Sequence, residues 1–153
     1  TRVRSSAASD VYKRQIRWSA SFGLGSSDLT HDCLPSDPPA QTELAAARAT
    51  VAERFQALEV PQPATAIAVG GSATSLRQLS GAVLDAEGFS RALSLLTRQP
   101  AQAVAHQFGL DPDRVRLLPA GLLILAGASE RLGLPLSVGA GGLREGVLLE
   151  SFY

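Results

Sequence analysis

The feature that most constrains the fold is the stretch Thr65-Ala66-Ile67-Ala68-Val69-Gly70-Gly71-Ser72-Ala73-Thr74-Ser75-Leu76. Small and β-branched apolar residues run directly into two glycines, and hydroxyl residues that suit the start of a helix follow. This order predicts a buried strand over Thr65–Val69, a tight turn at the glycines and a helix N-terminus just beyond.

The glycine turn has two interpretations. Without a Cβ, Gly70 and Gly71 let a ligand approach backbone N–H groups closely. The N–H donors and the positive dipole end of a following helix favour an anion such as phosphate at this place. The same sequence also suits an ordinary connection between a strand and a helix, so the turn by itself does not decide between the two.

Composition is that of one globular domain with a substantial core, since the chain has 153 residues of which 45% are hydrophobic. The formal net charge is zero and the basic residues are scattered, which favours neither a nucleic acid nor a membrane surface as partner. Cys33 is the only cysteine, which excludes an internal disulfide and fits a reducing compartment. No apolar run reaches bilayer length and no signal-peptide pattern is present, so we expect a cytoplasmic protein.

Residues 1–15 lack apolar periodicity and resemble a translated adapter scar at the end of a fragmentary reading frame. We expect them to be a non-native or disordered leader, and the native protein to begin upstream of Ile16. A basic arm for a nucleic acid is the alternative, but no aromatic or glycine pattern accompanies the charges.

Ile16–Phe22 alternates between apolar and polar residues, which predicts a half-buried strand. His31-Asp32-Cys33 contains metal-ligand residue types, but the chain has no second cysteine and His106 is distant. A polar loop is therefore the better interpretation than a zinc site.

The next segment predicts a long amphipathic helix. Asp37 is the expected N-cap, the prolines at 38 and 39 suit the first turn, and Glu43 would lie near the positive helix end. One apolar stripe then follows at helical spacing, formed by Leu44, Ala47, Val51, Phe55 and Leu58.

The remaining elements are shorter. We expect a loop over Gly81–Glu87, a helix over Phe89–Leu96, a helix over Ala101–Phe108 closed by Gly109, and a turn at Asp111-Pro112-Asp113 after which Pro119 restarts a helix. That last helix is apolar on most sides, which predicts a central position, and Gly133 should end it. Leu134–Val138 is a further short strand, followed by Gly139-Ala140-Gly141-Gly142 and a helix over Leu143–Glu150. Strands alternating with helices predict an α/β layered domain with at least two parallel strands.

Several motifs together resemble the exopolyphosphatase / guanosine pentaphosphate phosphatase (Ppx/GppA) family, over roughly Ile16 to Glu150. They are Trp18–Gly25, Ser36-Asp37-Pro38-Pro39, Val69–Thr74, Leu118–Leu125 and Gly142–Glu150, in this order. The resemblance implies a truncated ribonuclease-H-like lobe of the actin-like ATPase and sugar-kinase superfamily. Residues 16–153 would then be part of the second lobe of such a phosphatase.

The resemblance also implies site residues. Gly70, Gly71 and Ser72 would be the cleft turn that contacts phosphate or nucleotide, with Ser72 where the family usually has threonine. Thr74, Arg144 and Glu145 have either a cleft role or a structural one; Arg144 and Glu145 belong to a motif that equally suits a strand–helix turn with an ion pair.

The intact family member would release terminal phosphate from inorganic polyphosphate or guanosine pentaphosphate, by attack of water with Mg²⁺ support. The catalytic glutamate and the acidic phosphate loops of the family have no counterpart in this sequence, so no catalytic residue and no metal ligand is assigned. We therefore expect an inactive fragment of a phosphoanhydride hydrolase, which in the intact enzyme would have an N-terminal lobe and form a homodimer. The rival interpretation is a non-enzymatic actin-like or regulatory nucleotide-binding module.

In the implied lobe, the sheet order is 3-2-1-4-5. Ile16–Phe22 would be strand 3, Thr65–Val69 strand 4 and Leu134–Val138 strand 5, with strands 1 and 2 expected upstream. We predict that the last two strands pair in parallel, that Ile16–Phe22 is detached or lies in a non-native register beside Thr65–Val69, and that the chain self-associates through an open edge.

Overall fold

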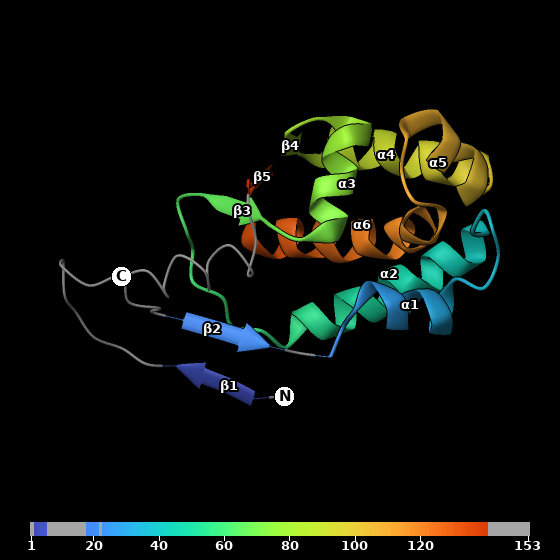
Figure 1. Cartoon of the computed structure of the whole chain (residues 1–153). Coiled ribbons are helices and arrows are strands. Elements are labelled where there is room, and N and C mark those ends of the chain that lie inside the picture. The colour runs from blue at the N-terminus through green and yellow to red at the C-terminus, as the bar shows by residue number, and fades with distance from the viewer. Residues whose placement is uncertain (1, 6–17, 22, 141–153) are drawn as a thin grey trace, which may run out of the picture.

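The computed structural model describes residues 2–5, 18–21 and 23–140, arranged as an α/β fold around one long central helix (Figure 1). The elements follow in the order β1 (Arg2–Ser5), β2 (Trp18–Ser21), α1 (Ser26–Cys33), α2 (Gln41–Gln56), β3 (Ala66–Ala68), α3 (Gly71–Ser80), β4 (Val83–Leu84), α4 (Ala86–Arg98), α5 (Ala101–Phe108), α6 (Pro112–Leu132) and β5 (Leu136–Val138).

Helix α6 lies at the centre, as its apolar sequence predicts, with α3, α4 and α5 on one side of it and α1 and α2 on the other (Figure 1). Leu118 and Leu122 of α6 are about 1% exposed, and each such side chain contributes roughly 1.5–3 kcal/mol to folding. The hydrophobic core is therefore built along this helix, and the sheet lies near its C-terminal end.

The helix α6 is continuous, which corrects the prediction of a turn followed by a restart at Pro119. Asp111 caps its N-terminus by accepting a hydrogen bond from Arg114 N–H at 3.0 Å. Pro119 lies inside the helix and is buried, so the carbonyl of Val115 lacks the usual i→i+4 donor. The surrounding core keeps the helix intact across this gap. Gly133 ends it in the left-handed conformation, as predicted, with φ of 66°.

The main sheet has the strand order β3-β5-β4. β3 and β5 are parallel, with Ala68 opposite Val138, which confirms the predicted pairing of the two strands. β4 pairs antiparallel with β5, with Leu84 opposite Leu136. A loop was predicted for these β4 residues. The strand has only two residues and depends on pairing with a distant segment.

Strand β2 lies outside that sheet and pairs antiparallel with β1, from Arg2 opposite Ser21 to Ser5 opposite Trp18. The half-buried side chains of Trp18 and Ala20 alternate with exposed serines, in agreement with the predicted strand. The pairing with residues 2–5 was not predicted, because residues 1–15 lack the apolar periodicity that indicates a strand.

Helix α2 begins at Gln41 rather than directly after Asp37, so Asp37 is not its N-cap. Glu43 holds the start of α2 instead, because its carboxylate accepts hydrogen bonds from the Ser36 hydroxyl at 2.6 Å and from Ala40 N–H at 2.9 Å. These two bonds, that of Ser36 first, lower the pKa of Glu43. Asp37 caps a different helix: its carboxylate oxygens accept Ala101 N–H at 2.9 and 3.2 Å at the start of α5.

The remaining boundaries follow local signals. α5 spans Ala101–Phe108 as predicted, between Pro100 and a left-handed Gly109. α4 is longer than expected because Asp85 caps it by accepting Gly88 N–H at 2.7 Å. The segment containing His31, Asp32 and Cys33 is the end of helix α1, which corrects the prediction of a polar loop.

Candidate functional site

The predicted order of strand, glycine turn and helix is present, but the strand is not buried as predicted. Only Ala68 is buried in it, and Ile67 and Val69 are 66% and 55% exposed. β3 ends at Ala68, Gly70 is the N-cap of α3, and α3 begins at Gly71. Gly70 has φ of 103° and ψ of 178°, a conformation that essentially only glycine adopts at low cost. The sequence therefore folds in this way because glycine stands where the backbone must reverse from strand to helix.

The turn is open on its outer side. A Cβ built on Gly70 or on Gly71 would meet no described atom within 4 Å. Both glycines are exposed. A ligand can consequently approach the backbone at this position without displacing any side chain that the structure describes.

The first turn of α3 carries no acidic residue and receives no side-chain cap among the described residues. Most of the other helices are different in this respect: carboxylates of Glu43, Asp37, Asp85 and Asp111 accept hydrogen bonds at or near the starts of α2, α5, α4 and α6. The N–H groups of Gly71, Ser72 and Ala73 precede the first intrahelical bond, which runs from Thr74 N–H to Gly70 O at 3.0 Å. The positive end of α3 can therefore receive an anion from outside.

Thr74, for which either a cleft role or a structural role was predicted, makes a hydrogen bond within its own helix start. Its hydroxyl donates to the carbonyl oxygen of Gly70 at 3.0 Å, the same oxygen that accepts Thr74 N–H. This double contact fixes the Gly70 peptide relative to the helix.

Ser72 directs its side chain toward the central helix. A Cβ built on Gly121 of α6 would lie 2.5 Å from Ser72 Oγ and 2.8 Å from Ser72 Cβ, so the two residues are in very close contact. What Ser72 presents at the turn is therefore its backbone N–H. Gly121 belongs to a stretch that the sequence analysis used only as a family motif and not as a site residue.

A further glycine, Gly139, lies beside the strand that leads into this turn. Gly139 directly follows β5, the parallel neighbour of β3, and donates its N–H to Ala68 O at 2.9 Å. A Cβ at Gly139 would approach Ile67 Cγ2 to 2.9 Å and Val69 Cγ1 to 3.1 Å. The glycine turn after β3 and Gly139 after β5 thus lie at the carboxyl ends of two parallel strands, the usual place for a ligand in an α/β sheet. The signal for Gly139, a glycine run after a strand, was present in the sequence but was not interpreted as part of the site.

The other site residues named from the sequence, Arg144 and Glu145, lie outside the described residues, as do Gly142 and Gly146 of the same motif.

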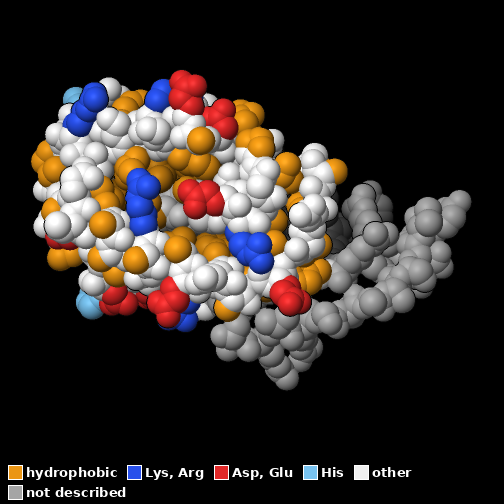
Figure 2. Space-filling view, turned by 180° about the vertical axis from the view of Figure 1, so that it is seen from behind, with side chains coloured by type: hydrophobic (Ala, Val, Ile, Leu, Met, Phe, Trp, Pro, Cys, Tyr) orange, Lys and Arg blue, Asp and Glu red, His pale blue; other side chains and the backbone are white. Residues whose placement is uncertain are grey.

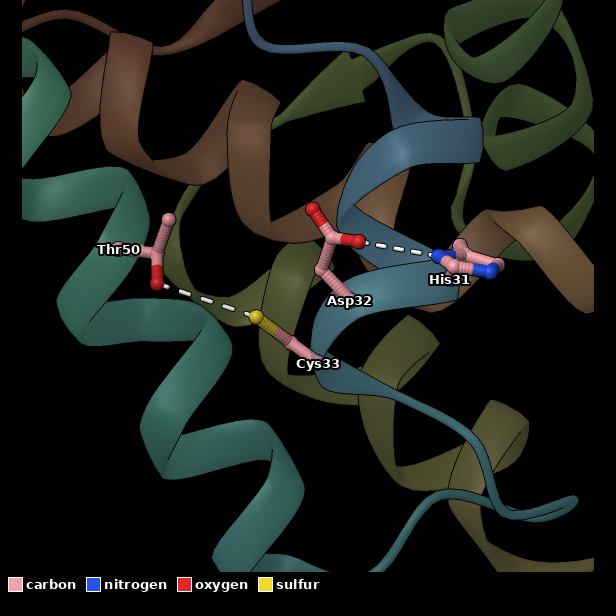
Figure 3. Close-up of polar contacts among 4 residues, drawn as sticks. All are labelled: His31, Asp32, Cys33 and Thr50. Carbon is pink, nitrogen blue, oxygen red and sulfur yellow. Dashed lines mark hydrogen bonds and ion pairs between the residues drawn. The ribbon is translucent and has the colours of Figure 1, made fainter.

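Figure 3 shows why His31, Asp32 and Cys33 do not converge on one point. His31 Nδ1 lies 3.0 Å from Asp32 Oδ1, whereas Cys33 Sγ points to α2, 3.8 Å from Thr50 Oγ1. The hydrogen bond to Asp32 and the charge of Asp32 raise the pKa of His31. Within the described ranges, no group of three or more His, Cys, Asp and Glu residues could hold a metal ion.

A hollow of about 670 Å³ lies between α2, α4 and α6. Apolar side chains such as Val51, Phe89 and Leu122 line it. None of Gly70, Gly71 and Ser72 lines it, so this hollow and the glycine turn are separate features.

On the face seen in Figure 2, basic and acidic side chains are interspersed among hydrophobic ones. Among the described residues, no helix is long and apolar enough to cross a membrane.

The chain is thus an α/β protein with an open glycine turn at the carboxyl end of a parallel strand, a position that suits an anion. The model of the Ppx/GppA phosphatase family matches residues 5–152, and the chain belongs to this family. A comparison with functionally curated proteins gave no match.

Solved structures of the same family share the fold. The type II variant of the Aquifex aeolicus Ppx/GppA phosphatase has a TM-score of 0.77 at 23% identity, over 86% of this chain and 48% of that chain. A second Aquifex aeolicus structure gives 0.76 at 22% identity, over 86% and 47%. An exopolyphosphatase-like protein gives 0.69 at 21% identity, over 84% and 48%. The chain spans about half the length of these structures.

Proposed function

We propose that this chain is part of a phosphoanhydride hydrolase that releases terminal phosphate from inorganic polyphosphate or guanosine pentaphosphate. Its own contribution is the turn Gly70-Gly71-Ser72, whose backbone N–H groups bind a phosphate of the substrate. The observation that carries the proposal is the open, uncapped N-terminus of α3 at the carboxyl end of a parallel strand, in a chain of the Ppx/GppA phosphatase family.

The chemistry assigned to these residues is binding and orientation. N–H donors at a helix start and the helix dipole favour the negative charge of a phosphate and hold it in one direction. A base that activates water is also needed, and we assign no described residue to that role. Mg²⁺ would support the reaction in the intact enzyme, and the described residues include no candidate cluster of ligands for it.

We further propose that the chain by itself releases no phosphate, that the intact enzyme is a cytoplasmic homodimer, and that an N-terminal lobe completes the cleft. The base would lie outside this chain, as the family resemblance implies. Robust Mg²⁺-dependent release of phosphate from polyphosphate by the purified 153-residue chain would contradict this assignment.

Binding tests the role of the turn directly. The isotope-labelled chain is titrated with inorganic tripolyphosphate while its amide resonances are followed by NMR. We expect the amides of Gly71, Ser72 and Ala73 to shift in a saturable way. Gly71→Val should abolish these shifts, because its side chain enters space that is empty in the free protein.

Gly23→Val is the matched control, since a Cβ at Gly23 also meets no described atom within 4 Å and Gly23 precedes α1 rather than α3. Its tripolyphosphate affinity should equal that of the wild type. Saturation at the turn by ATP or GTP without any response to tripolyphosphate would instead favour a regulatory nucleotide-binding module. No response to either ligand would overturn the phosphate-binding role.

A further inference from the structure

The close contact between Ser72 and Gly121 joins the glycine turn to the central helix. Ser72 is the second residue of α3, and Gly121 is a buried residue in the middle of α6. A Cβ at Gly121 would be 2.5 Å from Ser72 Oγ, and separations below 3.0 Å essentially never occur for real Cβ atoms. The first turn of α3 therefore occupies the space that any other residue at position 121 would fill.

This contact cannot be relieved by rotating one side chain. The Cβ of Ser72 itself would be 2.8 Å from the new atom, and the position of a Cβ is fixed by the backbone whatever the rotamer. Only a movement of the α3 backbone away from α6 makes room. Such a movement is resisted further along α3, because Ala73 and Leu76 are 1% and 0% exposed in the core.

We propose that Gly121 is a positioning residue: by lacking a side chain, it lets Ser72 lie against α6 and thereby fixes the direction of the N–H groups of Gly71, Ser72 and Ala73. The function served by this direction rests on the proposed phosphate-binding role of the turn. Gly121 touches no ligand in this scheme and acts through Ser72 alone.

Gly127 provides a matched control on the same helix. A Cβ at Gly127 would lie 2.6 Å from Val51 Cγ1 and 3.2 Å from Phe55 Cδ2, which are side chains of α2. The shortest separation is similar at the two glycines, 2.5 Å for position 121 and 2.6 Å for position 127. Only an alanine at position 121 presses on α3, so the two variants separate loss of packing from displacement of the turn.

The experiment compares the wild type with Gly121→Ala, Gly127→Ala, Ser72→Gly and the double variant Ser72→Gly/Gly121→Ala. The first measurement is ligand-free: NMR amide shifts of residues 71–74. We expect Gly121→Ala to move them and Gly127→Ala to leave them in place, although both lower the melting temperature. In the double variant the obstructing side chain is gone, so the amides should return to the positions that they have in Ser72→Gly alone.

The second measurement is the dissociation constant for inorganic tripolyphosphate. Gly121→Ala should weaken binding about tenfold, which corresponds to the loss of roughly one hydrogen bond to a charged group. The double variant should recover the affinity of Ser72→Gly, and Gly127→Ala should keep that of the wild type.

Three results would overturn the positioning role: unchanged amides in Gly121→Ala, equal displacement in Gly127→Ala, or no recovery in the double variant. If Gly121→Ala fails to fold, we expect the double variant to fold, because the obstructing side chain of Ser72 is gone. A double variant that also fails to fold would count against the proposal. A wild-type chain that does not bind tripolyphosphate would contradict the proposed function, while the ligand-free amide comparison would still decide whether Gly121 positions the turn.

Discussion

Gly70 and Gly81, at the two ends of α3, have the same backbone conformation. Their φ and ψ angles are 103° and 178° at Gly70, and 99° and −178° at Gly81. For both, a built Cβ meets no described atom within 4 Å, so an alanine at either position suffers from backbone strain and not from crowding. They form a matched pair in which only Gly70 lies at the candidate site.

Alanine at either glycine should lower the free energy of unfolding by a similar amount, about 1–3 kcal/mol, because each alanine must adopt a sparsely populated conformation. Chemical denaturation measures this change. Tripolyphosphate binding should fall in Gly70→Ala and stay at the wild-type value in Gly81→Ala. Equal loss of binding in both variants would show that the effect comes from stability rather than from the turn.

Asp37 is expected to stabilise the chain through α5. Asp37→Ala removes the acceptor of Ala101 N–H and should cost about 1 kcal/mol, the usual effect of losing a helix cap. Asp37→Asn keeps one oxygen acceptor and should lose less. Urea unfolding of the two variants compares them, and an alanine variant as stable as the wild type would exclude a capping role.

Helix boundaries and the glycine turn could be predicted because their causes lie within a few residues. Pro100 and Gly109 delimit α5, Gly133 ends α6, and the run from Thr65 into Gly70 gives the strand and turn. Each depends on backbone preferences of proline and glycine that act locally.

The incorrect predictions concern residues whose structural role depends on contacts with residues distant in the sequence. Asp37 resembles a cap for the helix that follows it, yet its partner Ala101 is 64 residues away. Pro119 is a helix breaker by local rules, but burial among the packed helices maintains α6 through it. In the candidate site the turn was predicted, whereas the role of Gly121 was not, because only the packing of α3 on α6 shows what a side chain there would meet.

The pKa of His31 should depend on Asp32. The hydrogen bond to Asp32, and next the charge of Asp32, raise it from the usual 6.5. Because the folded-state pKa is raised, the resulting stabilisation is complete below about pH 6.5 and is lost as the pH rises through the folded-state value. An NMR titration of Asp32→Ala should show a lower pKa than the wild type.

Asp28→Asn is the control for that titration, since Asp28 is the smallest contributor to the same shift. It should lower the pKa of His31 much less than Asp32→Ala does. Equal decreases in the two variants would indicate that the general negative charge of α1, and not the contact with Asp32, is responsible.

The outer edge of β3 should be the place where two copies of the chain associate. The carbonyl oxygen of Ala68 accepts a hydrogen bond from Gly139 N–H, so the backbone polar groups of Ala68 point toward β5. Because successive residues of a strand direct their backbone polar groups to opposite sides, the N–H groups of Ile67 and Val69 point to the other edge. In the described ranges no strand pairs with that edge, and Ile67 and Val69 are 66% and 55% exposed. An open apolar edge is a template for pairing with another chain, and a lysine on it opposes such pairing.

Ile67→Lys should therefore reduce self-association in sedimentation velocity experiments over a range of concentrations. Its free energy of unfolding should change by no more than about 0.5 kcal/mol, as for most exposed positions. Val83→Lys is the control, because Val83 is 49% exposed and lies on β4, the other edge strand, which is only two residues long. The same decrease in both variants would point to general charge repulsion, and a wild-type chain that stays monomeric with strongly protected amides at Ile67 and Val69 would show that the edge is already paired.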